Sequence, residues 1–236
     1  QRRRKAPAIM LEQLSGIVTS VGREILSWRG SSAAQGTWHG SQLKTEADLR
    51  AHAALSMELK RIFPDIPVVS EEDGASQSPT RPPRYWLIDP IDGTASFSEG
   101  FAGYVTQIAL IEDRQPRFGA IYAPALELLY LAQRGKGATL NGKRLRIASD
   151  PRRRVLIDNS PEPRGAARLA FERLRCTGYV ESGSISLKIC RVADGTADLF
   201  VKDITVRDWD IAPAHVVISE SGGVLAGLHG AAEIPY

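Results

Sequence analysis

The chain has 236 residues, of which 43% are hydrophobic and 24% are charged, with 21 glycines and 14 prolines. These proportions are typical of a globular protein and exclude a disordered chain, a collagen-like repeat and a disulfide scaffold. The sequence holds no apolar run of about 18 residues, so it predicts no membrane-spanning helix.

The positive charge is concentrated in two short clusters, at 2–5 and at 152–154, and the formal net charge is +3. Setting these seven residues aside from the 30 Lys and Arg leaves 23, against 27 Asp and Glu, so the body of the chain is slightly acidic. This distribution favours solvated surface charge, and we expect no nucleic-acid polymer as a partner. RNA binding through the two clusters remains a distant alternative.

The cysteines and histidines point to no redox or zinc site. Cys176 and Cys190 form no C-x-x-C motif, and the four histidines share no metal-ligand spacing. Free buried thiols of a cytoplasmic protein are therefore expected. Near the N-terminus, Glu12 and Gln13 interrupt the apolar residues, which predicts an amphipathic helix rather than a secretory signal.

The first part of the chain mixes helices and strands. Apolar residues that recur every three or four positions predict helices, and short apolar runs between turn residues predict strands. The expected elements are a helix at 11–25 ending near 30, a loop at 30–42, a helix at 45–63, a strand at 68–69, a loop at 75–83, a strand at 85–88 ending at 89–90, strands at 104–112, 117–122 and 127–132, and a hairpin at 141–142.

After residues 150–151 the pattern becomes a regular alternation, which is typical of an α/β unit. The expected order is a strand at 154–158, a helix at 165–175, a strand at 178–181, a helix at 185–194, a strand at 197–201, a helix at 209–221 and a strand at 223–225. We place a boundary near 148–152. It separates an N-terminal α+β subdomain at 1–150 from a C-terminal α/β subdomain at 151–236.

The most informative motif is D-P-I-D-G-T at 89–94, which follows an apolar strand. A tight bend after Asp89 would bring that carboxylate close to Asp92, and Mg²⁺ prefers such hard oxygen ligands. Gly93 leaves room for a ligand, and Thr94 can open a helix whose free N–H groups would hold a phosphate. An ordinary surface turn is the alternative, but the apolar flanking residues argue against it.

Acidic residues also occur at two other element ends, in Glu71-Glu72-Asp73 and at Asp210. Each group alone is weak, because such residues are often solvated or complement a helix dipole. Together with the 89–94 motif they are best explained by a two-metal site for phosphoryl transfer.

Three segments occur in the order of a known family: S-E-E-D at 70–73, W-L-I-D-P-I-D-G-T at 86–94, and W-D-I-A-P-A-H-V-V-I-S-E-S-G-G at 209–223. The chain thus resembles the lithium-sensitive, magnesium-dependent phosphatase superfamily of the inositol monophosphatase type. Y-A-P-A-L-E-L-L-Y at 122–130 and S-L-K-I-C at 186–190 are more similar to its CysQ branch, the 3′(2′),5′-bisphosphate nucleotidases. The resemblance implies a layered αβαβα sandwich, as in fructose-1,6-bisphosphatase.

The resemblance also implies roles for individual residues. The metal ligands would be the side chains of Glu71, Asp89, Asp92 and Asp210 and the carbonyl of Ile91. The catalytic residues would be Glu71 and the pair Asp48 and Thr94, which would position and deprotonate the attacking water. The substrate contacts would be Gly93, Thr94, Gly183 and Ser184. Lys188 and Arg207 could meet a second phosphate, with ordinary surface charge as the alternative.

The implied cofactor is Mg²⁺, as two or three ions, with inhibition by Li⁺. The expected activity is phosphomonoester hydrolysis by metal-activated water, with 3′-phosphoadenosine 5′-phosphate (PAP) converted to AMP. An inositol-phosphate or broader sugar-phosphate phosphatase is the alternative, and a non-catalytic module that binds divalent cations is a more distant one. The expected partner is then a small phosphorylated substrate, and no membrane association is expected. The sequence leaves the substrate, the number of metals and any homodimer open. Since relatives continue after the final G-G, further residues after Tyr236 are expected.

Overall fold

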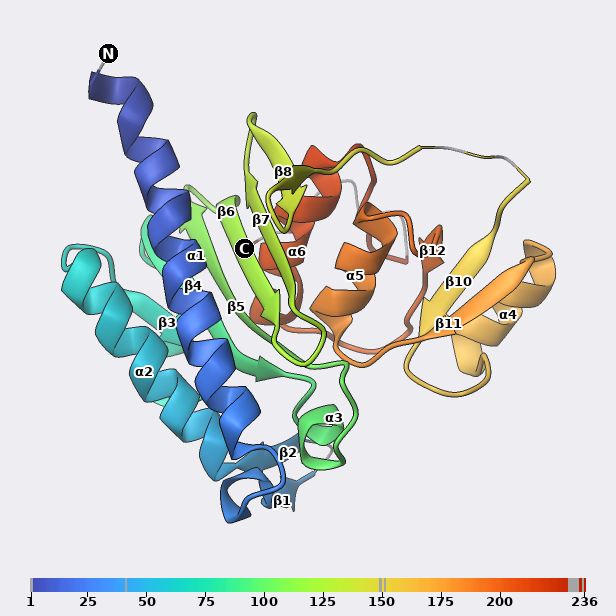
Figure 1. Ribbon diagram of the computed structural model, residues 1–236, viewed down its shortest axis with the longest axis horizontal. Coiled ribbons are helices and arrows are strands. Elements are labelled where there is room, and N and C mark those ends of the chain that lie inside the picture. The colour runs from blue at the N-terminus through green and yellow to red at the C-terminus, as the bar shows by residue number, and fades with distance from the viewer. Residues whose placement is uncertain (1, 41, 149, 151, 229–233, 235) are drawn as a thin grey trace.

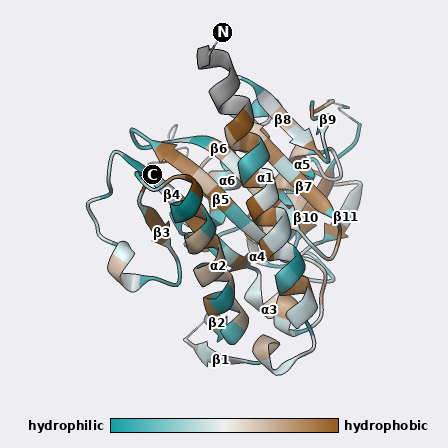
Figure 2. Cartoon of the chain, turned by 60° about the vertical axis from the view of Figure 1, so that its left-hand side comes forward, coloured by the Kyte–Doolittle hydropathy of each residue, from teal (hydrophilic) through white to brown (hydrophobic). Residues whose placement is uncertain are grey.

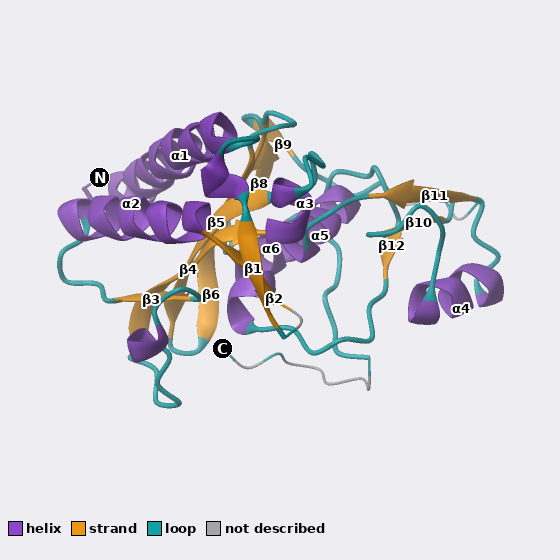
Figure 3. Ribbon diagram, turned by 90° about the horizontal axis from the view of Figure 1, so that it is seen from below, coloured by secondary structure: helices purple, strands orange, loops and turns teal. Residues whose placement is uncertain are grey.

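The computed structural model describes residues 2–40, 42–148, 150, 152–228, 234 and 236. Within this part of the chain, helices and sheets alternate in five layers, which follow one another from left to right in Figure 1 and are seen from below in Figure 3. The predicted αβαβα sandwich is therefore confirmed. Among the described residues, no helix combines the length and the apolar character needed to cross a bilayer.

The first layer is a pair of helices, α1 (Arg2–Trp28) and α2 (Glu46–Ile62). Helix α2 begins after the N-cap Thr45, whose side chain forms a capping box with Asp48, and it ends before Pro64. Their apolar faces pack on the sheet behind them, and Figure 2 shows hydrophobic strands beneath the mixed surfaces of both helices. Helix α1 starts earlier than the predicted residue 11.

The second layer is a sheet with the order β3-β4-β5-β6-β7-β8-β9 across the described residues. Strands β3 and β4 are parallel, and all later neighbours are antiparallel. The strands are β3 (Val68–Ser70), β4 (Arg84–Asp92), β5 (Val105–Glu112), β6 (Gln115–Ala123), β7 (Leu128–Gln133), β8 (Gly137–Leu140) and β9 (Lys143–Arg144). We call this the large sheet.

The remaining layers come from the second half of the chain. Helices α5 (Ile185–Ala193) and α6 (Asp208–Glu220) cover the other face of the large sheet. Beyond them lies a parallel sheet with the order β11-β10-β12 in the described chain, then α4 (Gly165–Arg173). Its strands are β10 (Val155–Asp158), β11 (Gly178–Glu181) and β12 (Leu199–Phe200). The predicted alternation after residue 152 is thus confirmed as far as α6.

Three sequence expectations are wrong. The predicted loop at 30–42 contains a 3₁₀ turn (Ser32–Ala34) and part of a hairpin, β1 (Gly36–His39) and β2 (Gln42–Thr45). These strands are short, and Trp38 is exposed, so they carry no buried apolar alternation to signal them. Residues 223–225 form no strand in the described chain, because Gly223 turns back onto Ile218 and Val224 is exposed.

The third error concerns β4, which continues through Pro90 to Asp92 instead of ending at 89–90. Strand β3 pairs with β4 only as far as Ile88, so the missing N–H of Pro90 interrupts no ladder on that side. On the other side the register with β5 shifts between Asp89 and Asp92. The motif is an irregular strand end rather than a bend after the strand. Part of the expected boundary, at 149 and 151, lies outside the described residues.

Candidate active site

Asp48 and Thr94 meet although 46 residues separate them. Thr94 opens the short helix α3 (Thr94–Ser98), as predicted, and its Oγ1 lies 3.1 Å from Asp48 Oδ1 and 3.0 Å from the Ile91 carbonyl oxygen. Asp48 Oδ2 accepts hydrogen bonds from the backbone N–H and the hydroxyl of Thr45, at 2.8 and 2.6 Å. Burial raises the pKa of Asp48 to about 6, and Thr45 and Thr94 oppose that rise.

Asp89 is 1% exposed and lies on the face of β4 that α6 covers. Gln107, its cross-strand neighbour on β5, donates through Nε2 to Asp89 Oδ2 at 3.4 Å and to the Trp209 carbonyl oxygen at 3.0 Å. Burial, followed by the negative charges of Glu71, Asp92 and Asp210, raises the pKa of Asp89 well above its usual range. This carboxyl therefore lies in a buried site that strongly disfavours its charge.

Asp92 is bound by the beginning of α5. The backbone N–H of Ser186 donates to Asp92 Oδ2 at 2.9 Å, and the Ser186 hydroxyl donates to the Asp210 carbonyl oxygen at 2.8 Å. Burial raises the pKa of Asp92, while the backbone N–H of Ser186 and the ammonium of Lys188 lower it. The second half of the chain thus contacts the 89–94 motif directly at this carboxylate.

Three glycines bring the two halves together beside this motif. Gly93 has a φ of 89°, and a Cβ added there would lie 3.2 Å from both the Gly103 carbonyl oxygen and the Ser184 Cβ. A Cβ on Gly183 would overlap the Gly103 carbonyl group. The backbone N–H of Ser184 donates to that carbonyl oxygen at 2.6 Å. Only glycine fits these close approaches, so the backbones meet without intervening side chains.

Glu71 and Asp210 complete the acidic group. Burial raises the pKa of Glu71 to about 8, and the charges of Asp210, Glu72 and Asp92 add to the rise. Burial also raises the pKa of Asp210 to about 7, with Asp92 as the next cause. Since the carboxylates act on one another, the structure brings together Glu71, Asp89, Asp92 and Asp210 from three separate segments.

The four carboxylates, which we call the acidic cluster, lie close but do not enclose a common point. Among the described residues, no group of three His, Cys, Asp or Glu side chains is arranged to hold a metal ion as it stands. Asp92 Oδ2 and Asp210 Oδ2 each accept a backbone N–H instead.

The donor set nevertheless fits a divalent cation. Asp89 Oδ1 is buried and has no hydrogen-bond partner in the described part of the chain. A buried carboxylate oxygen of this kind is costly unless something positive meets it. Glu71, Asp89, Asp92, Asp210 and the Ile91 carbonyl offer the hard oxygens that Mg²⁺ prefers.

The two predicted cations lie in different surroundings. Lys188 is 2% exposed: its Nζ donates to the Gly183 carbonyl oxygen at 2.5 Å and lies 5.2 Å from the centre of the Phe200 ring. Burial lowers the pKa of Lys188 to about 8. Arg207 is exposed and lines a cleft of about 680 Å³ with Arg81 and Arg114. Lys188 is therefore not surface charge, whereas Arg207 is exposed in the cleft.

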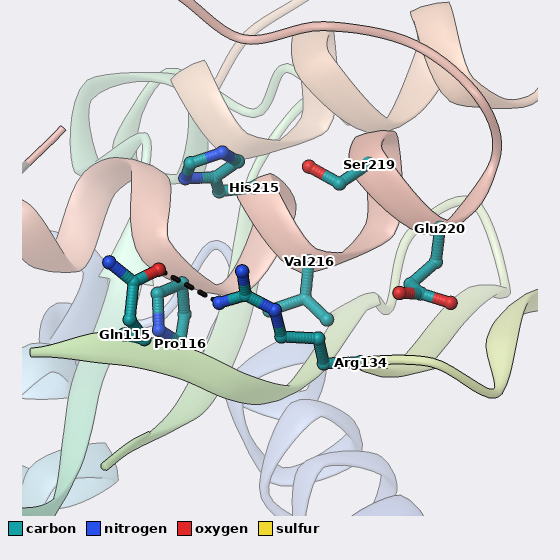
Figure 4. Close-up of a pocket in the computed structure, with 7 residues that line it drawn as sticks. All are labelled: Gln115, Pro116, Arg134, His215, Val216, Ser219 and Glu220. Carbon is teal, nitrogen blue, oxygen red and sulfur yellow. Dashed lines mark hydrogen bonds between the residues drawn. The ribbon is translucent and has the colours of Figure 1, made fainter. Parts of the chain in front are cut away.

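The pocket in Figure 4 lies away from these residues. It is formed between α6, the beginning of β6 and the turn that follows β7, and its volume is about 100 Å³. Its carboxylate, Glu220, already accepts hydrogen bonds from the N–H groups of Gly135 and Gly137. This pocket is too small for a nucleotide, and the acidic cluster is the better candidate site.

Sequence reasoning missed three polar contacts of the site. Gln107 could have been found, because the residues that share its strand face, Val105, Ala109 and Ile111, are all apolar. Ser186 begins the S-L-K-I-C segment, but the sequence did not indicate its contacts with Asp92 and Asp210. Lys44 ion-pairs with Glu72 at 3.0 Å, next to Glu71, and the pairing depends on a hairpin that the sequence did not reveal.

The fold has close counterparts among solved structures. An IMPase from Thermotoga maritima superposes with a TM-score of 0.76 at 25% sequence identity, covering 92% of this chain and 84% of that one. The five layers are thus those of an inositol monophosphatase-type fold.

The sequence comparisons then identify the family. The profile described as "Inositol monophosphatase family" matches residues 8–235, so the chain belongs to the inositol monophosphatase family, a family of phosphatases. The 3′(2′),5′-bisphosphate nucleotidase CysQ of Salmonella typhimurium is 36% identical over 189 residues, which are 78% of this chain and 74% of that protein. The Nus factor SuhB of Xylella fastidiosa is 31% identical over 196 residues, 79% and 70% of the two chains.

Proposed function

We propose that this phosphatase-family protein is a Mg²⁺-dependent phosphomonoesterase whose most favoured substrate is a 3′(2′),5′-bisphosphate nucleotide such as PAP. The observation that carries the hypothesis is the acidic cluster beside Gly93 and Thr94. Carboxylates from β4, from the end of β3 and from α6 raise one another's pKa there. Divalent cations would offset this concentration of buried negative charge.

In this proposal Glu71, Asp89, Asp92, Asp210 and the Ile91 carbonyl hold the cations. Bound Mg²⁺ would lower the pKa of water and neutralise charge on the transferring phosphoryl group. The backbone N–H groups of Gly93 and Thr94 would orient the scissile phosphate.

Asp48 and Thr94 would handle the proton of the attacking water. With a pKa of about 6, Asp48 is mostly ionised at neutral pH and can accept a proton through Oδ1 from Thr94 Oγ1, 3.1 Å away. Thr94 Oγ1 would in turn accept the proton of the water. General-base assistance of this kind typically contributes about 10²–10⁴-fold to a rate.

The two halves, 1–150 and 151–236, are proposed to divide the work. The first supplies most cation ligands, and the second supplies Gly183, Ser184 and Asp210. Identity to CysQ and the S-L-K-I-C segment favour a nucleotide bisphosphate. Inositol phosphates are the second candidate, because the fold also matches a solved IMPase.

A phosphate-release panel tests the proposal. Purified protein is assayed with Mg²⁺ on PAP, inositol 1-phosphate and fructose 1,6-bisphosphate, with and without Li⁺. We expect PAP to give the highest kcat/KM and Li⁺ to inhibit. Asp89→Asn should abolish release while circular dichroism stays native.

Asp73→Asn is the matched control for Asp89→Asn. Asp73 belongs to the same acidic run as Glu71, but its Oδ1 caps the 3₁₀ turn that follows by accepting the N–H of Ala75. It should retain activity. No release from any substrate by the folded wild-type protein would refute the enzyme and favour a cation-binding module, while inositol 1-phosphate as the best substrate would refute the nucleotide assignment.

A further inference from the structure

Gln107 is a polar residue in an apolar row. It is 0% exposed on β5, and its neighbours on the same strand face, Val105, Ala109 and Ile111, belong to the core beneath α5 and α6. A buried amide is costly unless its polar atoms are bonded. Its presence at this position therefore needs an explanation other than packing.

The side chain of Gln107 contacts two segments of the acidic cluster at once. Its Nε2 donates to Asp89 Oδ2 at 3.4 Å and to the carbonyl oxygen of Trp209 at 3.0 Å. An amide nitrogen carries two hydrogens, so both acceptors can be served together. Trp209 immediately precedes Asp210, so this one amide links β4 to the first turn of α6.

These contacts decide which oxygen of Asp89 is available. Gln107 engages Oδ2, while the buried Oδ1 has no partner in the described chain. We propose that Gln107 is a positioning residue that orients Asp89 and the first turn of α6 toward a divalent cation. The inference rests on the proposed function, because the cation belongs to that site.

A purely structural role explains the contacts less well. The other polar atom of the amide, Gln107 Oε1, is also buried, and no hydrogen-bond partner for it exists among the described residues. A residue that served the core alone would do better as an apolar side chain of the same length. Partners that orient metal ligands, in contrast, commonly change metal affinity about 10- to 100-fold when removed.

The test replaces the amide by an apolar chain of similar length, Gln107→Met. The Tm of substrate-free protein is measured against Mg²⁺ concentration, and kcat and KM are measured separately. We expect the half-saturating Mg²⁺ concentration to rise about tenfold or more. At saturating Mg²⁺ the KM for PAP should stay within about twofold of wild type, since Gln107 would act through Asp89 and the α6 turn.

Thr106→Val is the matched control. Thr106 neighbours Gln107 on β5, is equally buried and has an unpartnered Oγ1 in the described chain, but it faces α1 near Gly22. Its substitution should leave the half-saturating Mg²⁺ concentration unchanged. If both substitutions raise that concentration equally, strand packing rather than the amide is responsible, and the inference is wrong.

Gln107→Asn covers the case in which Gln107→Met does not fold. It keeps an amide but is one methylene shorter, so we expect weakened Mg²⁺ binding here also. A lower Tm with an unchanged half-saturating Mg²⁺ concentration, in either variant, overturns the positioning role. Should the wild-type Tm not respond to Mg²⁺ at all, the proposed metal site itself fails, and the two failures are thereby distinguished.

Discussion

The two faces of the large sheet bury different chemistry. Toward α1 and α2, the centre of β4 and β5 is apolar apart from Thr106, with Trp86, Ile88 and Ile108 among the buried residues. Toward α6, the same two strands present Asp89 and Gln107. Neighbouring residues of a strand point to opposite faces, so Asp89 and Gln107 lie on the α6 side while Ile88 and Ile108 lie on the other.

The largest effect is expected from Asp48→Asn, because Asp48 extends from α2 to contact Thr94 beside the acidic cluster. Asp48→Asn can keep the contacts to Thr45 but cannot accept a proton from Thr94. We expect kcat for phosphate release to fall about 10²–10⁴-fold, as when a general base is removed, with Tm and Mg²⁺ response near wild type. A loss smaller than about tenfold would remove Asp48 from the mechanism.

The apolar face should respond in the opposite way. Leu55 is fully buried on α2 in the core against the large sheet. Leu55→Ala leaves a cavity, and we expect about 2–5 kcal/mol lower free energy of unfolding in urea. The half-saturating Mg²⁺ concentration of the folded protein should not change. A higher half-saturating Mg²⁺ concentration without loss of stability would contradict the different roles assigned to the two faces.

The acidic face should also make stability depend on pH when no metal is bound. The folded-state pKa values of Glu71 and Asp210, about 8 and about 7, lie above the usual 4.5 and 3.8. The folded state therefore holds more protons than the unfolded state, and these groups stabilise it less as pH rises through this range.

We expect Tm in EDTA to be lower at pH 8 than at pH 5.5, with Mg²⁺ restoring more stability at pH 8. Differential scanning calorimetry at both pH values makes the measurement. A Tm in EDTA that rises across this interval would contradict the burial of the carboxylates.

The smallest effect concerns the N-cap of α2. Thr45→Ala removes the hydroxyl that donates to Asp48 Oδ2 and caps the helix, and we expect a loss of about 1 kcal/mol in unfolding free energy. Because Thr45 holds the pKa of Asp48 down, the acid limb of the kcat profile should move to higher pH. If the acid limb does not move, Asp48 is not the group whose titration sets that limb of the kcat profile.

Elements with a strong local signal were predictable from the sequence. The start of a helix near residue 45, the apolar spacing of α2 and the Asn141-Gly142 turn are each indicated by neighbouring residues, and the structure places them as expected. The meeting of Thr94 with Asp48 also agrees with the resemblance to the family.

Features that depend on packing between distant segments were not predictable. Lysine is usually a surface residue, yet Lys188 is buried and contacts the Gly183 carbonyl oxygen and the Phe200 ring. The continuation of β4 through Pro90 depends on where its pairing with β3 ends, and the sequence of β4 alone does not indicate that point. Long-range contacts of this kind set the electrostatics of the site.

The contact of Gly93 and Gly183 with Gly103 has a consequence for engineering. Because the backbones are in direct contact here, peptide geometry sets the distance between the two halves, and side-chain substitutions cannot shorten it. A chimera that grafts a foreign C-terminal half onto this N-terminal half must therefore retain glycine at all three positions.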